Sequence, residues 1–220
     1  MTHHVHPFAH RLGILRDWQS RWFARGADYQ AFLKTDVLIR KHLTKALRDM
    51  YVSAIEMERQ GTKLKVVIKT SRPGLIIGRS GEGITKLKRN LDAFVADKKL
   101  AGVDALKLDV EEVKSPESHA AIVAVMVREG IEKRMPFRRV LKQTADKVMA
   151  NRDVQGMRIT LSGRLGGADM ARREQIKKGR IPLQTFRADI DYAHDEAHIP
   201  QGQIGIRVWI YRGDIFETKK

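Results

Sequence analysis

The residues best suited by type and spacing to bind a ligand lie at 71–84, in the sequence SRPGLIIGRSGEGI. Gly78 and Gly81 lack Cβ atoms, so a sugar–phosphate chain can lie directly against the backbone between them. Arg79 and Ser80 stand between the two glycines and add one positive charge and one hydroxyl. If a helix begins near Gly81, its first N–H groups are unpaired and suit phosphate. These groups favour binding to a nucleic-acid backbone.

The elements expected around this motif are those of a KH domain. A strand pattern at Leu64–Thr70 leads into the glycines, and Ile84, Leu87 and Leu91 begin a helical repeat after them. Without such neighbours, an isolated glycine pair more often caps one helix and starts another. The expected order is helix, strand, strand, helix, helix, strand, with elements at 29–50, 52–58, 64–70 and 105–113 around the loop and its helices. This order predicts a type II KH domain, whose loop clamps about four nucleotides.

Specific side chains follow from this prediction. Ile77 and Ile84 are expected to anchor the two sides of the loop in the core. The first helix is expected to bury a stripe formed by Phe32, Leu33, Val37, Leu38, Leu43 and Leu47. The RNA-binding residues predicted in the loop and the helix after it are Arg72, Gly78, Arg79, Ser80, Gly81 and Lys86.

The composition favours a polyanionic partner. The 220 residues include 42 Lys and Arg against 26 Asp and Glu, a formal net charge of +16, and the pI is about 10.2. The chain has no cysteine, which excludes disulfides and cysteine-ligated zinc. An apolar signal segment is missing, and the longest apolar run, Ala120–Val127, is too short to span a bilayer. We therefore expect a cytoplasmic protein that binds nucleic acid, not membrane. We also predict that its working state is not a homo-oligomer.

The second half of the chain predicts an α+β domain. Lys114-Ser115-Pro116 ends the first unit, and Met135-Pro136 separates two helices expected at 117–134 and 137–149. Three strands are expected at 157–162, 182–192 and 205–211, giving two helices on an antiparallel sheet. The expected domain boundaries are an N-terminal arm at 1–28, the KH domain at 29–114, the second domain at 115–217 and a tail at 218–220.

A glycine-rich and basic loop is expected at 163–180. Gly166 and Gly167 permit close approach of a backbone, and five basic residues fall within Arg172–Arg180. A solvated loop could have this composition, but it would not require so much uncompensated charge. We therefore favour contact with RNA.

The N-terminal arm leaves alternatives open. His3, His4, His6 and His10 could form a metal site, but they lack carboxylate partners and regular spacing, so an extended arm touching RNA or solvent is favoured. The aromatic–basic segment 18–24 could stack on bases or pack on the first domain.

The segment 188–198 superficially resembles a catalytic or metal site. Its spacing does not fit H-E-x-x-H, because Glu196 follows His194 by two residues. Asp189 and Asp191 share one face of a strand and are expected to pair with arginines such as Arg187 or Arg207. The chain also lacks a P-loop, a cysteine nucleophile and a G-x-S-x-G elbow. We predict no enzyme, no cofactor and no metal.

Over nearly its whole length the chain closely resembles the bacterial small-subunit ribosomal protein number three, the S-three family. The segments that carry this resemblance are 71–81, Ser162–Asp169, Gly179–Leu183, Arg187–Tyr192 and Gly205–Gly213. Three positions depart from the usual family pattern. The arm has Thr2–Pro7 in place of a Gly-Gln-Lys type of start, Arg79-Ser80 replaces two lysines, and Gln143 stands where many members have a basic residue.

The resemblance implies a structural protein of the small-subunit head that binds ribosomal RNA (rRNA), mRNA and neighbouring ribosomal proteins. It implies that Arg138, Arg139 and Lys142 face the channel by which mRNA enters, where they help to unwind it. The rRNA-binding residues it suggests are Arg11, Lys147, Arg164, Gly166, Gly167, Arg172, Arg173, Lys177, Lys178 and Arg180. The alternatives are a free KH regulator of single-stranded RNA and a nuclease built on Asp189, Asp191 and Glu196.

Overall fold

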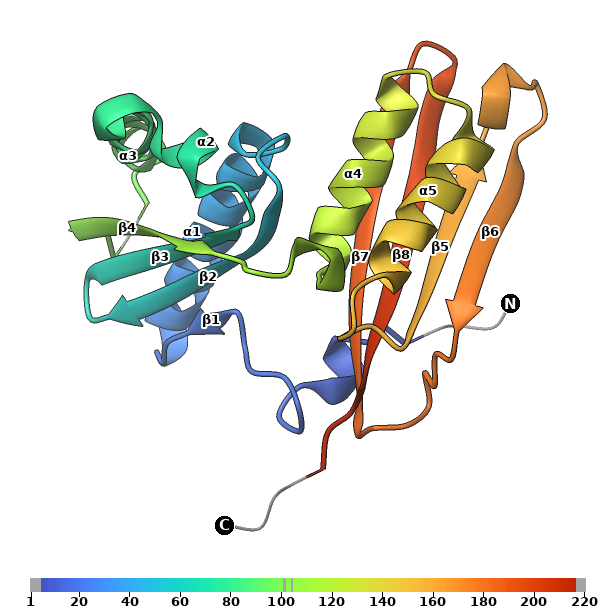
Figure 1. Cartoon of the computed structure of the whole chain (residues 1–220). Helices are drawn as coiled ribbons and strands as arrows, with labels where there is room; N and C mark the ends of the chain where they lie inside the picture. The colour runs from blue at the N-terminus through green and yellow to red at the C-terminus, as the bar shows by residue number, and fades with distance from the viewer. Residues whose placement is uncertain (1–4, 101, 104, 217–220) are drawn as a thin grey trace. The chain divides into compact units, whose positions relative to one another are not determined.

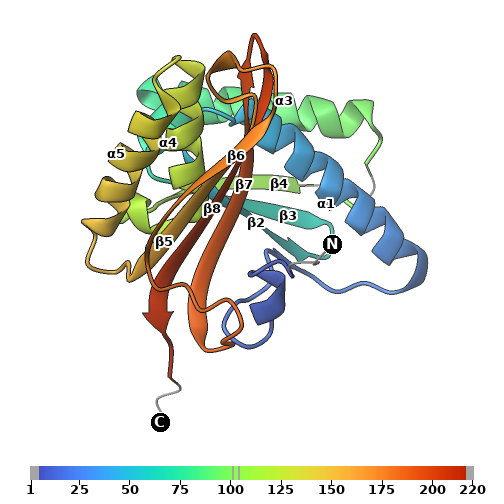
Figure 2. The same ribbon diagram turned by 90° about the vertical axis from the view of Figure 1, so that its right-hand side faces the viewer.

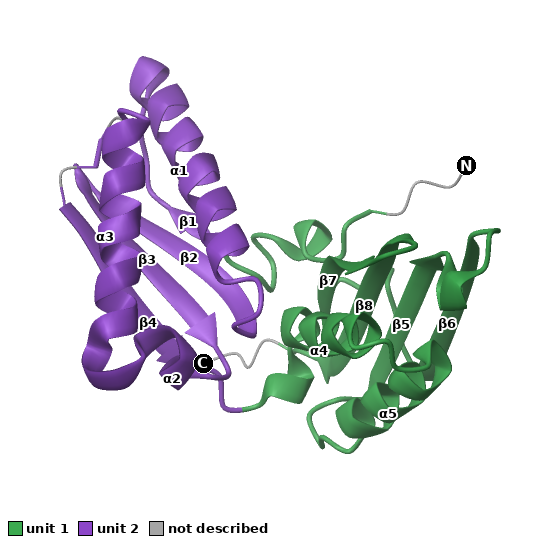
Figure 3. Cartoon of the chain, turned by 90° about the horizontal axis from the view of Figure 1, so that it is seen from above, with its two compact units in different colours: residues 1–17, 115–220 green, residues 18–114 purple. Residues whose placement is uncertain are grey.

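The structure is a computed structural model that describes residues 5–216 except 101 and 104. The chain forms two compact units, coloured separately in Figure 3. Unit 2 is the continuous segment Trp18–Lys114, whereas unit 1 combines Met1–Asp17 with Ser115–Lys220. The segment expected to be one arm at 1–28 is therefore divided after Asp17.

Unit 2 has the element order predicted for a type II KH domain (Figure 1). The elements are β1 (Ser20–Arg21), α1 (Gly26–Ala46), β2 (Val52–Gln60), β3 (Lys63–Thr70), α2 (Pro73–Ile77), η2 (Arg79–Gly81), α3 (Glu82–Asp97) and β4 (Ala105–Glu112). The sheet order is β1-β2-β3-β4, in which β2 and β3 are antiparallel and β3 and β4 parallel. The α-β-β-α-α-β order inferred from the sequence is confirmed.

The buried face of α1 differs from the predicted stripe. Leu33 and Val37 are 45% and 49% exposed, while Ile39 and Leu43 are fully buried. The helix is rotated relative to the expectation because Asp36 takes an inward position, where its carboxylate pairs with Arg59 at 3.2 Å. A buried carboxylate needs such a partner, so a polar pair occupies part of the face assigned to apolar residues.

The described part of unit 1 contains two α-helices, three short 3-10 helices and a four-stranded antiparallel sheet. Its elements are η1 (Ala9–Arg11), η3 (Pro116–Ser118), α4 (Ala120–Glu132), α5 (Phe137–Met149), β5 (Gly156–Gly163), η4 (Leu165–Gly167), β6 (Arg172–Gly179), β7 (Ala188–Ile199) and β8 (Gly202–Asp214). The strand order is β6-β5-β8-β7, with every neighbouring pair antiparallel. Both helices lie on the same face of this sheet (Figures 1 and 2), where they enclose the main apolar core.

Two expectations about unit 1 were wrong. The predicted loop 163–180 contains the edge strand β6, which pairs with β5 along its whole length. Its sequence, RREQIKKG, has one apolar residue, so the usual apolar signal of a strand is missing; charged edge strands are common because they discourage pairing with other chains. The strand expected from Pro182 begins only at Ala188.

The helices of the described chain were also compared with the dimensions of a bilayer. Within residues 5–216, none is both long enough and apolar enough to cross one.

Candidate nucleic-acid interface

The loop at 78–81 opens its backbone to the outside. Gly78 and Gly81 have φ of 72° and 79°, and Ser80 between them has φ of 51°, so all three occupy conformations that favour residues without a Cβ or with a short polar side chain. A Cβ on Gly81 would meet nothing within 4 Å. Arg79 and Ser80 are exposed at the start of α3. The loop therefore offers main-chain atoms and one charge with little steric hindrance.

The loop is supported by a close approach between the backbone of α3 at Gly83 and the backbone of α2. A Cβ on Gly83 would lie 2.5 Å from the carbonyl oxygen of Ile76 and 2.9 Å from that of Ile77. Ile76 is the buried anchor on this side, with Ile84 packed against the same core. Ile77, which was expected to be the anchor, is 38% exposed, because α2 turns Ile76 inward instead.

The basic residues around this loop point outward from fixed positions. The guanidinium of Arg72 lies 4.1 Å from the ring centroid of Tyr51, and its backbone N–H donates to Thr70 Oγ1 at 3.1 Å. Lys86 is exposed on α3, one turn after the loop. Glu82 is also exposed there, so the positive charge of the loop is modest.

The outer face of α5 is the most concentrated basic surface on a helix of unit 1. Arg138, Arg139 and Lys142 are all exposed and fall within about 100° of arc, since each residue advances a helix by about 100°. Arg138 has one long contact, 3.4 Å, to Glu174 of β6. The same face continues to Asp146, whose carboxylate accepts a hydrogen bond from Lys178. That hydrogen bond is the main reason why the pKa of Asp146 is lowered.

The turn after β5 is organised by Arg164. Its guanidinium donates to Asp169 at 2.8 Å, to Ala168 O at 3.0 Å and to Gln201 O at 3.2 Å. Gly166 and Gly167 have φ of 71° and 80° and meet only side-chain ends beyond 3.7 Å. Arg164 thus shapes this turn, while the two glycines present open backbone.

The basic residues predicted on β6 divide between the two faces of the sheet. Arg172 and Lys178 share the helix side with acidic partners, since Arg172 lies 4.0 Å from Glu174 and Lys178 pairs with Asp146. Arg173 and Lys177 alternate with them and are exposed on the opposite side. Lys147 on α5 and Arg180 after β6 are exposed as well.

Comparison with known proteins gives consistent matches in both units. A family model described as KH domain matches residues 38–118, and one described as ribosomal protein S3, C-terminal domain, matches residues 127–210. A small ribosomal subunit protein uS3 from Caldicellulosiruptor bescii is 45% identical over 219 residues, covering 100% of this chain and 96% of that protein. One from Hydrogenovibrio crunogenus is 42% identical over 217 residues, covering 99% and 92%.

This chain belongs to the ribosomal protein S3 family. The resemblance inferred from the sequence is therefore confirmed, as is the fold class of a KH domain followed by an α+β domain. The family also supports the prediction of a protein that is not an enzyme.

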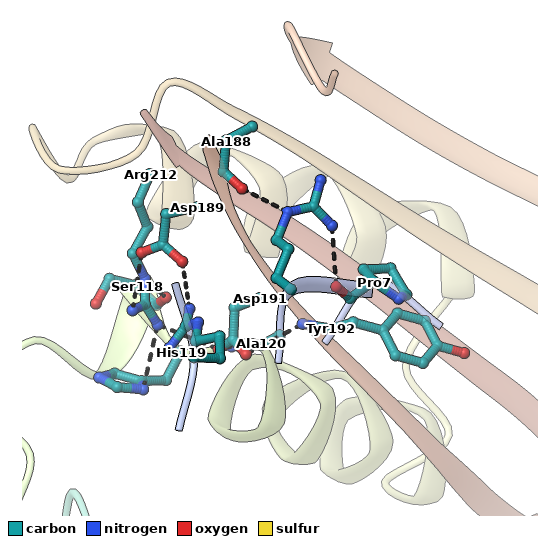
Figure 4. A network of polar contacts seen from close by, with 11 residues as sticks. Pro7, Ser118, His119, Ala120, Ala188, Asp189, Asp191, Tyr192 and Arg212 are labelled. Atoms are coloured by element: carbon teal, nitrogen blue, oxygen red, sulfur yellow. Dashed lines mark hydrogen bonds and ion pairs between the residues drawn. The ribbon is translucent and has the colours of Figure 1, made fainter. Parts of the chain in front are cut away.

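Arg11, which was expected on the rRNA surface, is instead buried in unit 1. Its exposed fraction is 0%, and its guanidinium donates to the carbonyl oxygens of Ala188 at 2.6 Å, Pro7 at 2.9 Å, Thr185 at 2.9 Å and Leu183 at 3.0 Å. These bonds fasten the N-terminal segment to the start of β7 (Figure 4). A guanidinium engaged in this way is not free to meet phosphate, so we leave Arg11 out of the RNA surface.

The carboxylates that superficially resembled a catalytic site belong to an ion-pair network (Figure 4). Asp189 accepts from Arg16 at 2.5 Å and lies 3.7 Å from Arg212, while Asp191 accepts from Arg212 at 3.2 Å. Asp191 also accepts from the N–H of Ala120 at 2.8 Å and so caps α4. Pairing with arginine was predicted, but the partners named, Arg187 and Arg207, were wrong.

His119 takes part in this network and has an altered affinity for protons. Burial lowers the pKa of its imidazole, and the nearby Arg212 adds to that effect, while Asp191 opposes it. Arg212 Nη2 lies 3.4 Å from His119 Nδ1, and since a guanidinium only donates, this nitrogen must be the acceptor. Among residues 5–216, apart from the two left out, no group of three His, Asp or Glu is arranged to hold a metal ion.

The two tryptophans of segment 18–24, for which the sequence allowed either stacking on bases or packing on the first domain, lie in different surroundings. Trp22 packs on unit 2, where its Nε1–H donates to Asp36 at 2.7 Å and its ring lies 5.4 Å from that of Tyr29. Trp18 is 62% exposed. In the histidine arm, His6 meets Tyr192 edge-on at 4.8 Å and His10 stacks on Phe186 at 4.3 Å; His3 and His4 lie outside the described residues.

Proposed function

We propose that this chain is a structural, RNA-binding component of the small ribosomal subunit and that it binds the subunit's rRNA. The observation that carries the proposal is the full-length match to proteins named small ribosomal subunit protein uS3. The open backbone at Gly81, beside the exposed Arg79 and Ser80, supports it, because a KH loop holds nucleotides through such a backbone. The ribosome is then its place in the cell, with rRNA, mRNA and neighbouring ribosomal proteins as its partners.

The proposal assigns different RNA contacts to the two units. In unit 2 the predicted loop residues Arg72, Arg79, Ser80 and Lys86 remain candidates, since all four are exposed. In unit 1 the predicted rRNA contacts that remain are Lys147, Arg164, Gly166, Gly167, Arg172, Arg173, Lys177, Lys178 and Arg180. Lys178 and Arg172 must first leave their acidic neighbours, so we expect them to contribute least.

A finer part of the proposal concerns mRNA. Arg138, Arg139 and Lys142 form a positive face on a helix that is itself packed on a sheet, so the charges are held in a fixed row. Such a row binds phosphates without reading sequence. We propose that this face lines the channel by which mRNA enters and helps to separate paired mRNA, with no nucleotide cofactor.

The primary test is sedimentation of a cell lysate through sucrose gradients at moderate and high salt, followed by detection of this protein in each fraction. Co-migration with the small subunit at moderate salt is expected, and release at high salt should follow if phosphate contacts dominate. Recovery only in soluble fractions would contradict the proposal and favour a free KH regulator.

The role of the α5 face is tested by the triple variant Arg138→Glu, Arg139→Glu, Lys142→Glu. We expect normal assembly into subunits but slower translation of messengers with stable hairpins, measured against unstructured messengers. A matched control reverses three exposed lysines of α1 (Lys34, Lys41 and Lys45), which changes net charge equally. Equal speeds on both messengers in the α5 variant would exclude this role.

The carboxylates that a nuclease would require are not arranged as a catalytic site. Asp189 and Asp191 neutralise Arg16 and Arg212, and Asp191 also caps α4, so both are part of the structure of unit 1. Glu196 projects from the other face of β7, because residues an odd number apart on a strand point to opposite sides. We therefore do not propose hydrolysis.

A further inference from the structure

The chain passes between its two units twice. The first crossing lies between Asp17 and Trp18, and the second lies between Lys114 and Ser115. On the unit 1 side, residues within four positions of each crossing belong to one network of ion pairs and hydrogen bonds (Figure 4). The members of this junction network, all in unit 1, are Arg16, Ser118, Asp189, Asp191 and Arg212.

The segment that leads to the first crossing is a closed turn fastened to the start of β7. The N–H of Arg16 donates to Arg11 O at 3.0 Å, and the N–H of Gly13 donates to Arg16 O at 2.9 Å. Arg16 Nη2 donates to Asp189 Oδ1 at 2.5 Å, while Arg11 Nε donates to Ala188 O at 2.6 Å. The chain is therefore anchored at residue 16, directly before unit 1 gives way to unit 2.

The segment after the second crossing is fastened to β8 through Arg212. The N–H and the hydroxyl of Ser118 donate to Ser115 O at 3.2 and 2.9 Å, so a tight turn follows the crossing at once. Arg212 Nε donates to Ser118 O at 2.9 Å, and its Nη2 donates to Asp191 Oδ2 at 3.2 Å. Because Asp191 also accepts from the N–H of Ala120, this anchor extends into the first turn of α4.

Arg212 and Asp189 join the two anchors to each other. Arg212 Nη1 lies 3.7 Å from Asp189 Oδ2, while Arg16 is bonded to the other oxygen of the same carboxylate. The side chains of Arg16, Asp189 and Arg212 are 23%, 13% and 20% exposed, so salt screens their charges less than it screens charges on an open surface. Arg212 holds three groups at once because its planar guanidinium presents donors in a fixed fork, which a lysine ammonium does not.

We propose that the junction network couples the two crossings, so that releasing one loosens the other, and that it thereby limits the motion between the two units. Arg16 orients the Asp189 carboxylate, and this carboxylate helps to hold Arg212 against Ser118. Without Arg16 the carboxylate is free to turn, and Arg212 then holds Ser118 less firmly. The proposal needs no contact with RNA, so it goes beyond the proposed function and does not depend on it.

The coupling is tested by amide hydrogen exchange in the full-length protein. The variant Arg16→Gln changes the first crossing, and exchange is followed beside the second, at the amides of Ser118, His119 and Ala120. We expect exchange at these three amides to rise at least about fivefold, the lower end of the usual coupling between sites.

Two further variants test the route of the coupling. Arg212→Lys keeps the charge but loses the fork, so it should also speed exchange at the amides of Leu15 and Arg16, which donate to Arg11 O. The matched control is Asp195→Asn. It removes a carboxylate charge from the same strand, β7, where Asp195 accepts from Arg128 at 2.8 Å, and it should leave the amides at both crossings unchanged.

Motion between the units is measured as the width of a spin-label distance distribution. The chain has no cysteine, so Lys88→Cys in unit 2 and Arg152→Cys in unit 1, both at exposed positions, provide one label site each. The distribution should be wider in Arg16→Gln and Arg212→Lys than in the wild type, and it should be unchanged in Asp195→Asn.

Three results would overturn the proposal. In Arg16→Gln, faster exchange confined to residues 12–16 would show that the crossings are anchored independently. An equal response in Asp195→Asn would indicate a general loss of stability in unit 1. Distance distributions of equal width in all variants would show that the network does not limit motion. If Arg212→Lys fails to fold, Arg16→Gln decides alone. Neither measurement involves ribosomal subunits, so the proposed function and this proposal can fail separately.

Discussion

The loop at 78–81 and the outer face of α5 are both exposed, yet they offer RNA different groups. The loop contributes backbone at two positive-φ glycines and a single charge between them, Arg79. The α5 face contributes side chains, because Arg138, Arg139 and Lys142 project from the exposed side of a helix. A backbone site depends on conformation, whereas a side-chain site depends on charge.

This difference predicts opposite sensitivities to mutation. Adding a single methyl group should distort the loop, because the loop depends on glycines that have no Cβ. The same addition should leave the α5 face intact. Reversing a charge should impair the α5 face as an RNA site and leave the loop intact. The folding of α5 should not suffer, since its exposed charges contribute little to folding.

The largest effect is expected for Gly83→Ala. The new Cβ would lie 2.5 Å and 2.9 Å from two carbonyl oxygens, and those backbone atoms cannot move aside as a flexible side chain would. We expect unit 2 to lose about 1–3 kcal/mol, in the range of overpacked sites. Thermal unfolding and amide hydrogen exchange in α3 would measure it.

Gly74→Ala is the matched control for that prediction. Gly74 lies in α2, its φ is not positive, and a Cβ there meets nothing within 4 Å. Its stability should stay within about 0.5 kcal/mol of the wild type. Equal losses in the two variants would mean that the approach of α3 to α2 does not hold the loop.

A smaller effect is expected from pH and should be confined to unit 1. Burial places the pKa of His119 below its ordinary value of 6.5, so between the two values the unfolded chain binds more protons than the folded one. The free energy of unfolding of unit 1 should therefore be highest above about pH 6.5 and should fall as the pH drops from there toward the lowered pKa. The groups facing His119 are Arg212, Asp191, Arg16 and Asp189. Amide exchange in α4 as a function of pH would measure it, and His119→Gln should flatten the dependence.

The sequence predicted those features that depend on neighbouring residues. Gly78, Gly81 and the strand before them are close in the chain, so the KH loop could be inferred from spacing, whereas the basic residues of α5 were suggested by the resemblance to the family. Contacts between distant segments could not be inferred in this way. Arg11 bonds to Ala188, 177 positions away, and Arg16 pairs with Asp189, 173 positions away. Nothing local in either arginine distinguishes it from an RNA-binding one.

Strand β6 shows a second limit of the sequence. Both of its faces are polar, because one faces solvent and the other meets charged groups of α5, so Ile176 is its one apolar residue. A pattern method recognises a strand by a buried apolar face, which this edge strand does not have. Only the strand register shows which basic residues of β6 lie on the side of the sheet that has acidic partners and which lie on the other side.

The smallest effect tests whether charge alone governs the side-chain surface. Asp146 lies on the same face of α5 as Lys142 and holds Lys178 by a hydrogen bond, so Asp146→Ala removes one negative charge and releases one positive charge. Only a small loss of stability is expected, because the ion pair of Asp146 with Lys178 is exposed to solvent and an acid in the last turn of a helix opposes the helix dipole. Affinity for RNA should rise slightly, and the salt slope should steepen by up to about 1.

Glu82→Ala makes the same change of charge beside the KH loop, but it removes an acid from the first turn of α3, where the dipole favours one. That variant should therefore lose about 0.3–1 kcal/mol of stability. If both variants behaved alike in stability and in RNA affinity, the distinction between a backbone site and a side-chain site would not hold.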